Sequence, residues 1–295
     1  MSTVDWGTGV NAEAIKAWDG PLYDRFHRYR HIFTTGLGAH GDRALAISPP
    51  RPGERVLDIG CGFGDMTQQI AALVGPQGEV VGVDAAERFV ETAREEAEQA
   101  GVTNARFLVG DVQTADLGEA AHDLAFSRMG TMFFAGPVPA MRNVLRSLKP
   151  GGRLAMVVWR QRADNDWLYK AQTIVERIVS RPEEYDEPTC GPGPFSMANA
   201  DTTSDILLHA GFEDIALHRC DLPVLVGRDM DEAIEVVTAL GPAGEILRLA
   251  GDRAAHLHDQ VDAALREGLR EFETPAGFVG GASTWIVTAR VPSAD

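Results

Sequence analysis

VLDIGCGFG, residues 56–64, is an apolar run that leads into three glycines at alternate positions, and the amphipathic pattern of a helix follows it. Glycines at a strand-to-helix turn let the backbone turn sharply and let a ligand lie against it. The spacing is GxGxG, with Asp65 where a dinucleotide-binding GxGxxG has its third glycine, and Asp58 lies two residues before the first glycine. An acidic side chain there repels a pyrophosphate and attracts a cation. The segment therefore predicts a ligand-binding loop that differs from the dinucleotide-binding kind.

Strand and helix alternate from residue 56 to residue 159. Apolar runs typical of strands are separated by stretches with helical periodicity; the runs are VLDIG, EVVGVD, RFLVGD, LAFSR and RLAMVVW. This alternation indicates an α/β fold, doubly wound, with a parallel sheet and helices on both faces. Two later strands are expected at 215–226 and 283–290, with helical stretches near 229–240 and 252–272 between them.

The regions that flank this alternation read differently. The first 50 residues have helical periodicity, with Leu22, Phe26, Tyr29 and Phe33 on one apolar face, and SPPRPGE then interrupts the pattern. Residues 181–200 are rich in proline and glycine, so we expect an irregular insertion there.

Composition limits the classes of partner. The chain has 43 acidic and 27 basic residues, a formal net charge of −16, which repels a nucleic-acid backbone and an anionic membrane surface. The chain has an odd number of cysteines, Cys61, Cys190 and Cys220, with no CxxC or Cys/His spacing. Neither a disulfide framework nor a metal site is therefore expected. No leader peptide and no run of 18 apolar residues is found. We expect a cytoplasmic chain without a membrane span, without a metal and without a nucleic-acid partner.

Two further aspartates follow expected strands. Asp84 ends the second strand, 20 residues after Gly64, where such folds place a carboxylate on the ribose hydroxyls of a nucleoside. Asp111 ends the third strand, where a carboxylate can accept from an exocyclic amine such as that of adenine. Each aspartate alone could be a helix N-cap or a solvated loop residue. Together with Asp58, they predict a nucleoside-binding edge of the sheet.

The run from Asp58 through Leu148-Lys-Pro-Gly-Gly152 resembles the class I S-adenosylmethionine-dependent methyltransferase family, and within it the ubiquinone/menaquinone-biosynthesis C-methyltransferase branch with its small-molecule relatives. The resemblance implies a Rossmann-like, seven-stranded sheet of order 3-2-1-4-5-7-6 with strand 7 antiparallel. It implies S-adenosyl-L-methionine as the cofactor. The cofactor-binding residues that it implies are Asp58, Gly60, Cys61, Gly62, Gly64, Asp84, Ala85, Asp111, Val112 and Ser127.

The resemblance also implies a domain organisation. Residues 1–50 are expected to form a helical lid over the cofactor, residues 51–160 the cofactor-binding core, and residues 161–295 the rest of the sheet with helical, substrate-side insertions before the last strand. We expect a single domain overall.

The end of the fourth strand, AFSRMGTMFF, is where the resemblance places the mouth of the acceptor pocket. Met129, Phe133 and Phe134 are candidate apolar walls, and packing in the core is the alternative. Arg128 could clamp an acidic group of the substrate or could pair with a neighbouring carboxylate. The segment lacks the Asn/Asp-Pro-Pro-Tyr tetrad and the Pro-Cys nucleophile of DNA methyltransferases.

His27 and His31 lie one helical turn apart, and either could act as a general base; an exposed histidine without a role is the alternative. Tyr23 and Trp159 are candidate pocket walls, with ordinary packing as the alternative.

The expected function is in-line transfer of a methyl group to a small, largely apolar molecule such as a secondary metabolite or a quinone- or phenol-like acceptor. Two other classes stay open. A nicotinamide-dependent oxidoreductase would share the fold but needs GxGxxG, and a non-catalytic adenosylmethionine-binding module would keep the glycine loop without a usable pocket. The acceptor, the methylated atom, the need for a general base and the oligomeric state are not determined by the sequence.

Overall fold

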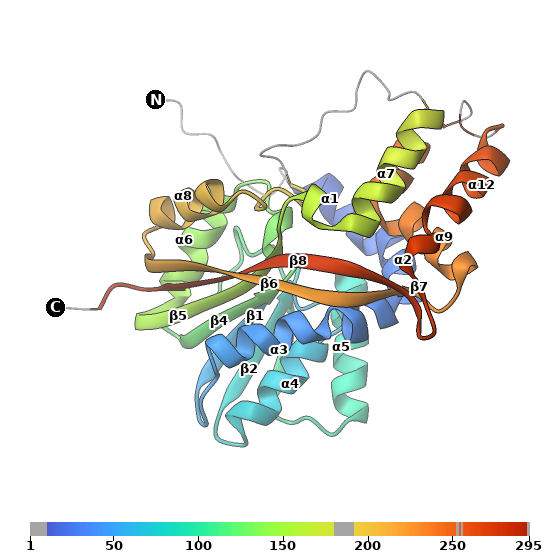
Figure 1. Cartoon of the computed structure of the whole chain (residues 1–295). Helices are drawn as coiled ribbons and strands as arrows, with labels where there is room; N and C mark the ends of the chain where they lie inside the picture. Colours follow the sequence, from blue (N-terminus) through green and yellow to red (C-terminus); the bar gives the residue numbers. More distant parts are fainter. Residues whose placement is uncertain (1–10, 180–191, 252–253, 255, 294–295) are drawn as a thin grey trace.

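The computed structural model describes residues 11–179, 192–251, 254 and 256–293, and it places a twisted sheet at the centre of the fold (Figure 1). The strand order is β3-β2-β1-β4-β5-β8-β6, and a two-residue strand, β7, pairs with β8. β8 is antiparallel to both of its long neighbours, while the pairs from β3 to β5 are parallel. The strands are β1 Arg55–Ile59, β2 Glu79–Asp84, β3 Ala105–Val109, β4 His122–Arg128, β5 Leu148–Trp159, β6 Glu213–Gly227, β7 Glu273–Thr274 and β8 Gly277–Arg290.

The predicted fold is therefore confirmed, with β8 as the expected seventh strand and β7 as an addition. The central strand β1 is covered on both faces: Val56, Leu57 and Ile59 have no exposed surface, and Asp58 between them is 1% exposed. Both predicted late strands are longer in the structure, since β6 and β8 pair along most of their lengths.

Helices cover both faces of the sheet (Figure 1). On one face lie α3 Gly38–Ile47, α4 Asp65–Val74 and α5 Glu87–Gln99, and on the other lie α6 Pro137–Ser147 and α8 Ala200–Ala210. A further group of helices packs together at one end of the β6–β8 pair: α7 Asp166–Ile178, α9 Met230–Leu240, α10 Pro242–Ala250 and α12 His258–Gly268. Short 3-10 turns are η3 Thr131–Phe133, η4 Arg162–Asp164 and η5 Arg270–Phe272.

The N-terminal segment is helical as predicted, but it is broken into short pieces. The pieces before α3 are α1 Ala12–Ala17, η1 Trp18–Leu22, α2 Tyr23–Arg28 and η2 Ile32–Gly36, of which η1 and η2 are π-helical. Gly20 has non-helical backbone angles directly before Pro21, and Tyr29 leaves the helical region at the end of α2. Proline lacks the backbone N–H that a continuous helix needs. Of the four residues of the expected apolar face only Tyr29 is buried, while the rings of Phe26 and Phe33 stack at 4.3 Å.

The C-terminal insertion before β8 is confirmed, with differences in detail. The stretch expected at 229–240 is α9, while the stretch expected at 252–272 contains a shorter helix, α12, and the turn η5. Most of the expected irregular segment, together with Cys190, lies outside the described residues, and α8 begins at residue 200. The sequence analysis does not predict α7, α8 or α10. None of the helices in the described part of the chain is long and apolar enough to cross a membrane.

Candidate functional site

The glycine loop between β1 and α4 requires glycine at two positions for different reasons. Gly60 has a φ of +65°, and a Cβ there would lie 2.8 Å from the Cα of Gly130. Gly64 has a φ of +77°, and a Cβ there would lie 2.8 Å from the Phe107 ring. The loop is therefore pressed against the loop after β4 on one side and against β3 on the other. At Gly62 a Cβ would meet only the Phe89 ring, at 3.9 Å, so this part of the loop is more open.

Asp84 ends β2 and faces the glycine loop. One carboxylate oxygen, Oδ2, accepts the Gly62 backbone N–H at 3.0 Å, and Oδ1 accepts that of Ala86 at 3.0 Å. A carboxylate offers about four acceptor positions, so Asp84 holds the loop and can still accept from a ligand. Burial raises the pKa of this carboxyl, and the two backbone N–H groups oppose that shift.

Asp58 lies at the bottom of the same loop, 1% exposed. Its Oδ2 accepts the hydroxyl hydrogen of Thr67. Burial raises its pKa from 3.8 to about 7, with the charge of Asp65 adding to the rise and the Thr67 hydrogen bond and the Arg128 charge opposing it. The ionisation of Asp58 is thus balanced near neutral pH, and a nearby cation would favour the charged form.

Asp111 lies two residues beyond the end of β3 rather than in the strand. Its Oδ1 accepts the Gln113 backbone N–H at 3.0 Å, and its Oδ2 accepts the Gln113 side-chain amide at 3.2 Å and that of Asn11 at 2.7 Å. The next residue, Val112, is buried, and its carbonyl accepts from Asn143 at 2.7 Å. The N-terminal segment therefore reaches this corner of the site through Asn11, a contact 100 residues apart in sequence.

The other residues that the resemblance implies for the cofactor site lie near the loop without offering free polar side chains. Cys61 is buried, and burial raises the pKa of its thiol well above the ordinary value. The Ser127 hydroxyl donates to the Ile59 carbonyl at 2.8 Å and so ties β4 to β1. Ala85 is half-buried between β2 and α5.

Aromatic side chains of the N-terminal segment cover the glycine loop. The N-terminal aromatic cluster consists of Trp18, Tyr23 and Phe26, which pack against Phe63 of the loop and Phe89 of α5. The Tyr23 ring lies 5.0 Å from that of Phe89, and the Phe63 and Phe89 rings lie 4.7 Å apart. The Tyr23 hydroxyl lies 2.7 Å from that of Thr92. Tyr23, expected as a pocket wall, therefore joins the N-terminal segment to the loop and to α5.

The two candidate histidines diverge because the helix breaks at Tyr29. His27 is exposed, and its ring stacks on Tyr23 at 5.7 Å and lies 6.0 Å from that of Phe63. The His31 Nε2 lies 3.4 Å from a carboxylate oxygen of Glu232 on α9. Of the two, only His27 lies beside the glycine loop.

Arg128, at the end of β4, pairs with Asp65 at the start of α4, with 2.7 Å between Nη2 and Oδ2. Its side chain is 11% exposed, and a Cβ at Gly41 of α3 would lie 3.3 Å from its Cδ. This packing favours pairing with a neighbouring carboxylate over a substrate clamp. The next residue, Met129, has a φ of +64°, a conformation that non-glycine residues rarely adopt and that often marks functional sites.

The remaining expected pocket walls lie close to this strained turn. Phe133 and Phe134 are half-buried against the main core, and the Phe133 ring lies 4.8 Å from Trp18. Trp159 is 9% exposed, and its backbone N–H points to the Met132 sulfur at 3.3 Å. The N-terminal aromatic cluster therefore connects the glycine loop with the segment after β4.

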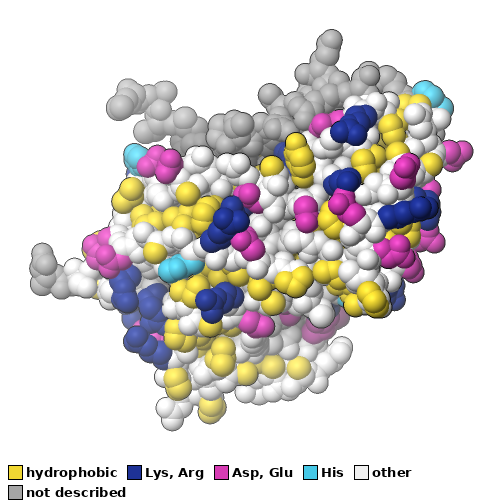
Figure 2. All heavy atoms as spheres, viewed as in Figure 1, with side chains coloured by type: hydrophobic (Ala, Val, Ile, Leu, Met, Phe, Trp, Pro, Cys, Tyr) yellow, Lys and Arg dark blue, Asp and Glu magenta, His cyan; other side chains and the backbone are white. Residues whose placement is uncertain are grey.

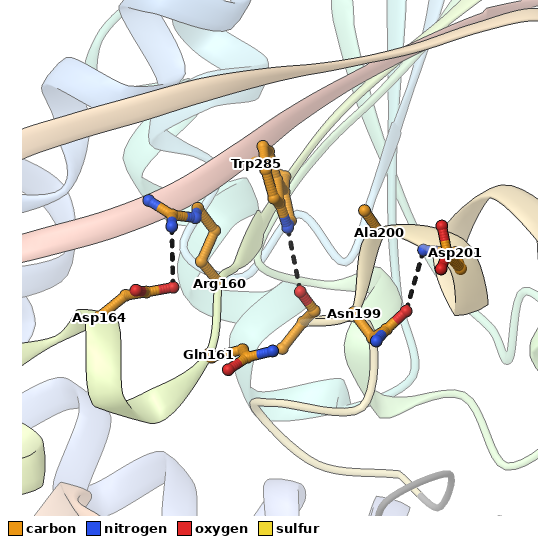
Figure 3. Close-up of a pocket in the computed structure, with 8 residues that line it drawn as sticks. Arg160, Gln161, Asp164, Asn199, Ala200, Asp201 and Trp285 are labelled. Carbon is orange, nitrogen blue, oxygen red and sulfur yellow. Dashed lines mark hydrogen bonds and ion pairs between the residues drawn. The ribbon is translucent and has the colours of Figure 1, made fainter.

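A polar pocket of about 340 Å³ opens at the carboxyl end of β5, directly after Trp159 (Figure 3). Arg160 pairs with Asp164 and with Asp221, each at 2.9 Å, and its guanidinium lies 5.0 Å from the ring centre of Trp285. The Trp285 indole N–H donates to the Ala198 carbonyl at 3.0 Å. The lining residues are Arg160, Gln161, Asp164, Ala198, Asn199, Ala200, Asp201 and Trp285.

Neither this pocket nor the roles of Asn11 and Phe63 are predicted from the sequence. The pocket is assembled from three segments, 160–164, 198–201 and 285, which no local pattern connects. Phe63 stands inside the glycine motif and could have been found from that position. Asn11 gives no signal before the chain is folded.

Part of the chain is similar in sequence to curated methyltransferases. The chain is 39% identical to aklanonic acid methyltransferase DauC of Streptomyces sp. (strain C5) over 115 residues, covering 39% of this chain and 52% of the relative. It is 36% identical to the ubiquinone/menaquinone biosynthesis C-methyltransferase UbiE of Ectopseudomonas mendocina (strain ymp) over 114 residues, covering 38% of this chain and 44% of the relative. The chain thus spans about half the length of these curated relatives.

Two solved structures share the fold. The [4+2]-cyclase SpnF superposes with a TM-score of 0.51 at 22% identity, covering 87% of this chain and 82% of SpnF. Phosphoethanolamine N-methyltransferase 2 of Haemonchus contortus, in complex with phosphomonomethylethanolamine and S-adenosylhomocysteine, superposes with a TM-score of 0.51 at 19% identity, covering 85% of this chain and 53% of that one.

The family described as "Methyltransferase domain" matches residues 50–207, more than half of the chain, from the turn before β1 to the middle of α8. The match contains the glycine loop and all three aspartates at the edge of the sheet. The resemblance seen in the sequence is confirmed: the chain belongs to the methyltransferase domain family.

Proposed function

We propose that the chain is an S-adenosylmethionine-dependent methyltransferase that acts on a small, largely apolar molecule. The observation that carries the proposal is the position of Asp58, Asp84 and Asp111 at or just beyond the carboxyl ends of the neighbouring strands β1, β2 and β3, with Asp84 bonded to the glycine loop. Open α/β sheets bind their ligands at this edge. The family match and the two methyltransferase relatives support the same activity.

The residues present fit this cofactor in three respects. Asp84 has acceptor positions left for a ribose diol after holding Gly62 and Ala86. Gly62 leaves room where a side chain would otherwise stand. A bound cation would favour the ionised form of the Asp58 carboxyl.

When bound, S-adenosylmethionine supplies a methyl group already activated on a sulfonium. The chain has to bind and orient the acceptor and exclude water, and orientation of this kind contributes roughly 7–11 kcal/mol in favourable cases. Met129, Phe133 and Phe134 are proposed to contact the apolar body of the acceptor, with Trp159 beside them. His27 is proposed as the general base where the acceptor must lose a proton.

The two alternative classes have less support. A nicotinamide-dependent oxidoreductase would need room for a pyrophosphate beside Asp58, whose burial and charge oppose it. A non-catalytic adenosylmethionine-binding module is distinguished from an enzyme by an assay of methyl transfer. The assay is needed because the same fold is found in SpnF, which is named as a cyclase.

A nucleic-acid acceptor is disfavoured by the charge of −16. Figure 2 shows acidic side chains spread over the viewed face, with groups of Lys and Arg between them. Cytoplasmic location remains a prediction from the cysteine content.

The proposal is tested by incubating the protein with methyl-labelled S-adenosylmethionine and fractionated host metabolites. We expect label in a small organic product, which mass spectrometry then identifies, and S-adenosylhomocysteine in equal amount. Binding of the cofactor without label in any fraction would favour the non-catalytic module, and binding of a nicotinamide cofactor instead would contradict the proposal.

The affinity for S-adenosylmethionine should fall as the pH falls from 8 to 6. The pKa of Asp58 is raised to about 7, so the carboxylate that attracts the cationic cofactor becomes neutral over this range. By linkage the loss can reach, at most, about tenfold per pH unit below the pKa. Calorimetry at several pH values measures it, and Asp58→Asn should remove most of the dependence. An equal dependence in Asp58→Asn would assign it to another group.

The raised pKa of Asp58 also predicts how stability depends on pH. Because the folded chain binds the Asp58 proton more tightly than the unfolded chain does, the free energy of unfolding falls as the pH rises from 3.8 to about 7. Above about pH 7 this group causes no further decrease. The cofactor should offset this loss, since its cation stabilises the ionised form.

Amide exchange in residues 11–35 should slow when S-adenosylhomocysteine is added. The N-terminal aromatic cluster lies over the glycine loop, so opening of this segment would uncover the site, and a ligand beneath it should hold it closed. Hydrogen exchange followed by mass spectrometry measures the effect, with α8 as the internal control. Equal protection with and without the ligand would contradict a lid.

Replacing Arg128 with methionine should lower the free energy of unfolding by roughly 1.5–3 kcal/mol, the scale of hydrogen bonds to charged groups. The variant keeps an apolar stem against α3 but loses the pair with Asp65. Affinity for S-adenosylhomocysteine should fall with it, because Asp65 directly follows the glycine loop. Arg51→Met is the matched control, because the Arg51 side chain is 70% exposed and lies 4.0 Å from the carboxylate of Glu54. Unchanged stability with reduced turnover would instead support the substrate clamp.

A further inference from the structure

Asn11 stands at the N-cap position of α1 but does not cap the helix. Asparagine is among the preferred residues there because its side-chain oxygen accepts a backbone N–H of the first turn. In α1 the residue has helical backbone angles and its side chain makes no capping hydrogen bond. The side chain is directed instead to Asp111, and the residue is 9% exposed.

The contact with Asp111 fixes the orientation of the Asn11 amide. Nδ2 donates to Asp111 Oδ2 at 2.7 Å, and a carboxylate can only accept, so the amide oxygen cannot take that place. The Oδ1 of Asn11 is bonded to the same carbon as Nδ2 and therefore stays next to the carboxylate. It is buried and has no hydrogen-bond partner within the described part of the chain. A buried acceptor without a donor costs free energy, and a ligand that supplies the donor recovers it.

Asp111 has one acceptor position to spare. Its Oδ2 accepts from Asn11 and from the Gln113 side chain, and its Oδ1 accepts from the Gln113 backbone. Of about four acceptor positions on a carboxylate, three are used, and the free one is on Oδ1. Two acceptors therefore remain in this corner, the Oδ1 of Asp111 and the Oδ1 of Asn11.

We propose that Asn11 and Asp111 together bind the exocyclic amine of the cofactor's adenine, each accepting one of its two N–H hydrogens, so that Asn11 determines specificity for adenine over its deaminated form. The proposal rests on the proposed function, because it assigns the adenine end of the same site. Two adjacent acceptors match an amine, which is a donor of two hydrogens. A carbonyl oxygen at that position of the base can donate to neither of them and adds a third acceptor.

The test compares S-adenosylhomocysteine with S-inosylhomocysteine, in which a carbonyl replaces the amine. Titration calorimetry on the full chain should show the wild type binding the adenosyl ligand at least about tenfold more tightly, as for a site whose buried polar groups reject a ligand that cannot pair with them. Asn11→Ala should weaken the adenosyl ligand by about tenfold and the inosyl ligand by less than about twofold, so that discrimination falls.

Controls separate this role from a structural one. Lys16→Ala, an exposed change on the same helix, should leave both affinities unchanged. Asn11→Asp keeps the shape but sets a second carboxylate against Asp111, and should weaken both ligands. Equal weakening of both ligands in Asn11→Ala, or unchanged affinities, would overturn the proposal while leaving the cofactor site standing. Failure of the wild type to bind S-adenosylhomocysteine would instead refute the proposed function.

Discussion

Asp84→Ala is expected to weaken the binding of S-adenosylhomocysteine by about 10- to 150-fold, which corresponds to roughly 1.5–3 kcal/mol. Two losses add in this variant. The ribose hydroxyls lose a carboxylate acceptor, the glycine loop loses the hydrogen bond from Gly62, and the start of α5 loses the hydrogen bond from Ala86, each at 3.0 Å. Titration calorimetry measures the affinity, and thermal unfolding shows how much of the effect is structural.

The two losses can be separated by a second variant. Asp84→Asn keeps one side-chain oxygen that can accept a backbone N–H, so it should preserve more of the loop conformation than Asp84→Ala does. It should still bind the ribose more weakly than the wild type. Glu119→Ala removes an exposed acidic side chain elsewhere and controls for the change in net charge. An unchanged dissociation constant in Asp84→Ala would exclude Asp84 from the site.

Gly60→Ala is expected to lower the melting temperature by roughly 5–15 °C and to abolish most cofactor binding. An added Cβ would lie 2.8 Å from the Cα of Gly130, and the backbone there has a φ of +65°. Overpacking costs about 1–3 kcal/mol and the left-handed conformation about 1–2 kcal/mol, and each kcal/mol shifts the melting temperature by about 2–4 °C in a chain of similar size.

Two other glycines separate the causes. Gly53 has a φ of +83° but open space around it, so Gly53→Ala should show the conformational cost alone. Gly130 has a φ of −85°, but a Cβ there would lie 2.7 Å from the Ile59 carbonyl oxygen, so Gly130→Ala should show the steric cost alone. Gly60→Ala should be the most damaging of the three. If Gly53→Ala were equally damaging, the close approach of the two loops would not be the cause.

The sequence predicts the alternating core well because each of its elements is specified locally. Strands such as β1 and β2 are rich in apolar residues, and the spacing of the three glycines indicates the loop that binds a ligand. The three aspartates follow from their positions after consecutive strands. The order of the sheet came from family resemblance, since nothing local distinguishes one pairing of parallel strands from another.

The elements outside the core were predicted less well. The N-terminal segment has helical periodicity, but it is broken at Gly20 and Pro21 and again at Tyr29, and this second break separates His27 from His31. α10 is not among the predicted helices; in the structure Gly241 ends α9 and Pro242 begins α10, at the first helical position, where the missing N–H of proline is not needed.

Residue type and spacing were enough to indicate the glycine loop, the acidic edge of the sheet and the family, because these depend on neighbours within a few positions in the chain. Tertiary structure alone determined the partner of Arg128, the pocket beside Arg160 and the contact of Asn11 with Asp111. The physical reason is that a side chain's partner depends on which distant segments the fold brings within hydrogen-bonding distance. A buried amide oxygen becomes informative only when the surrounding donors are known, and no local pattern specifies them.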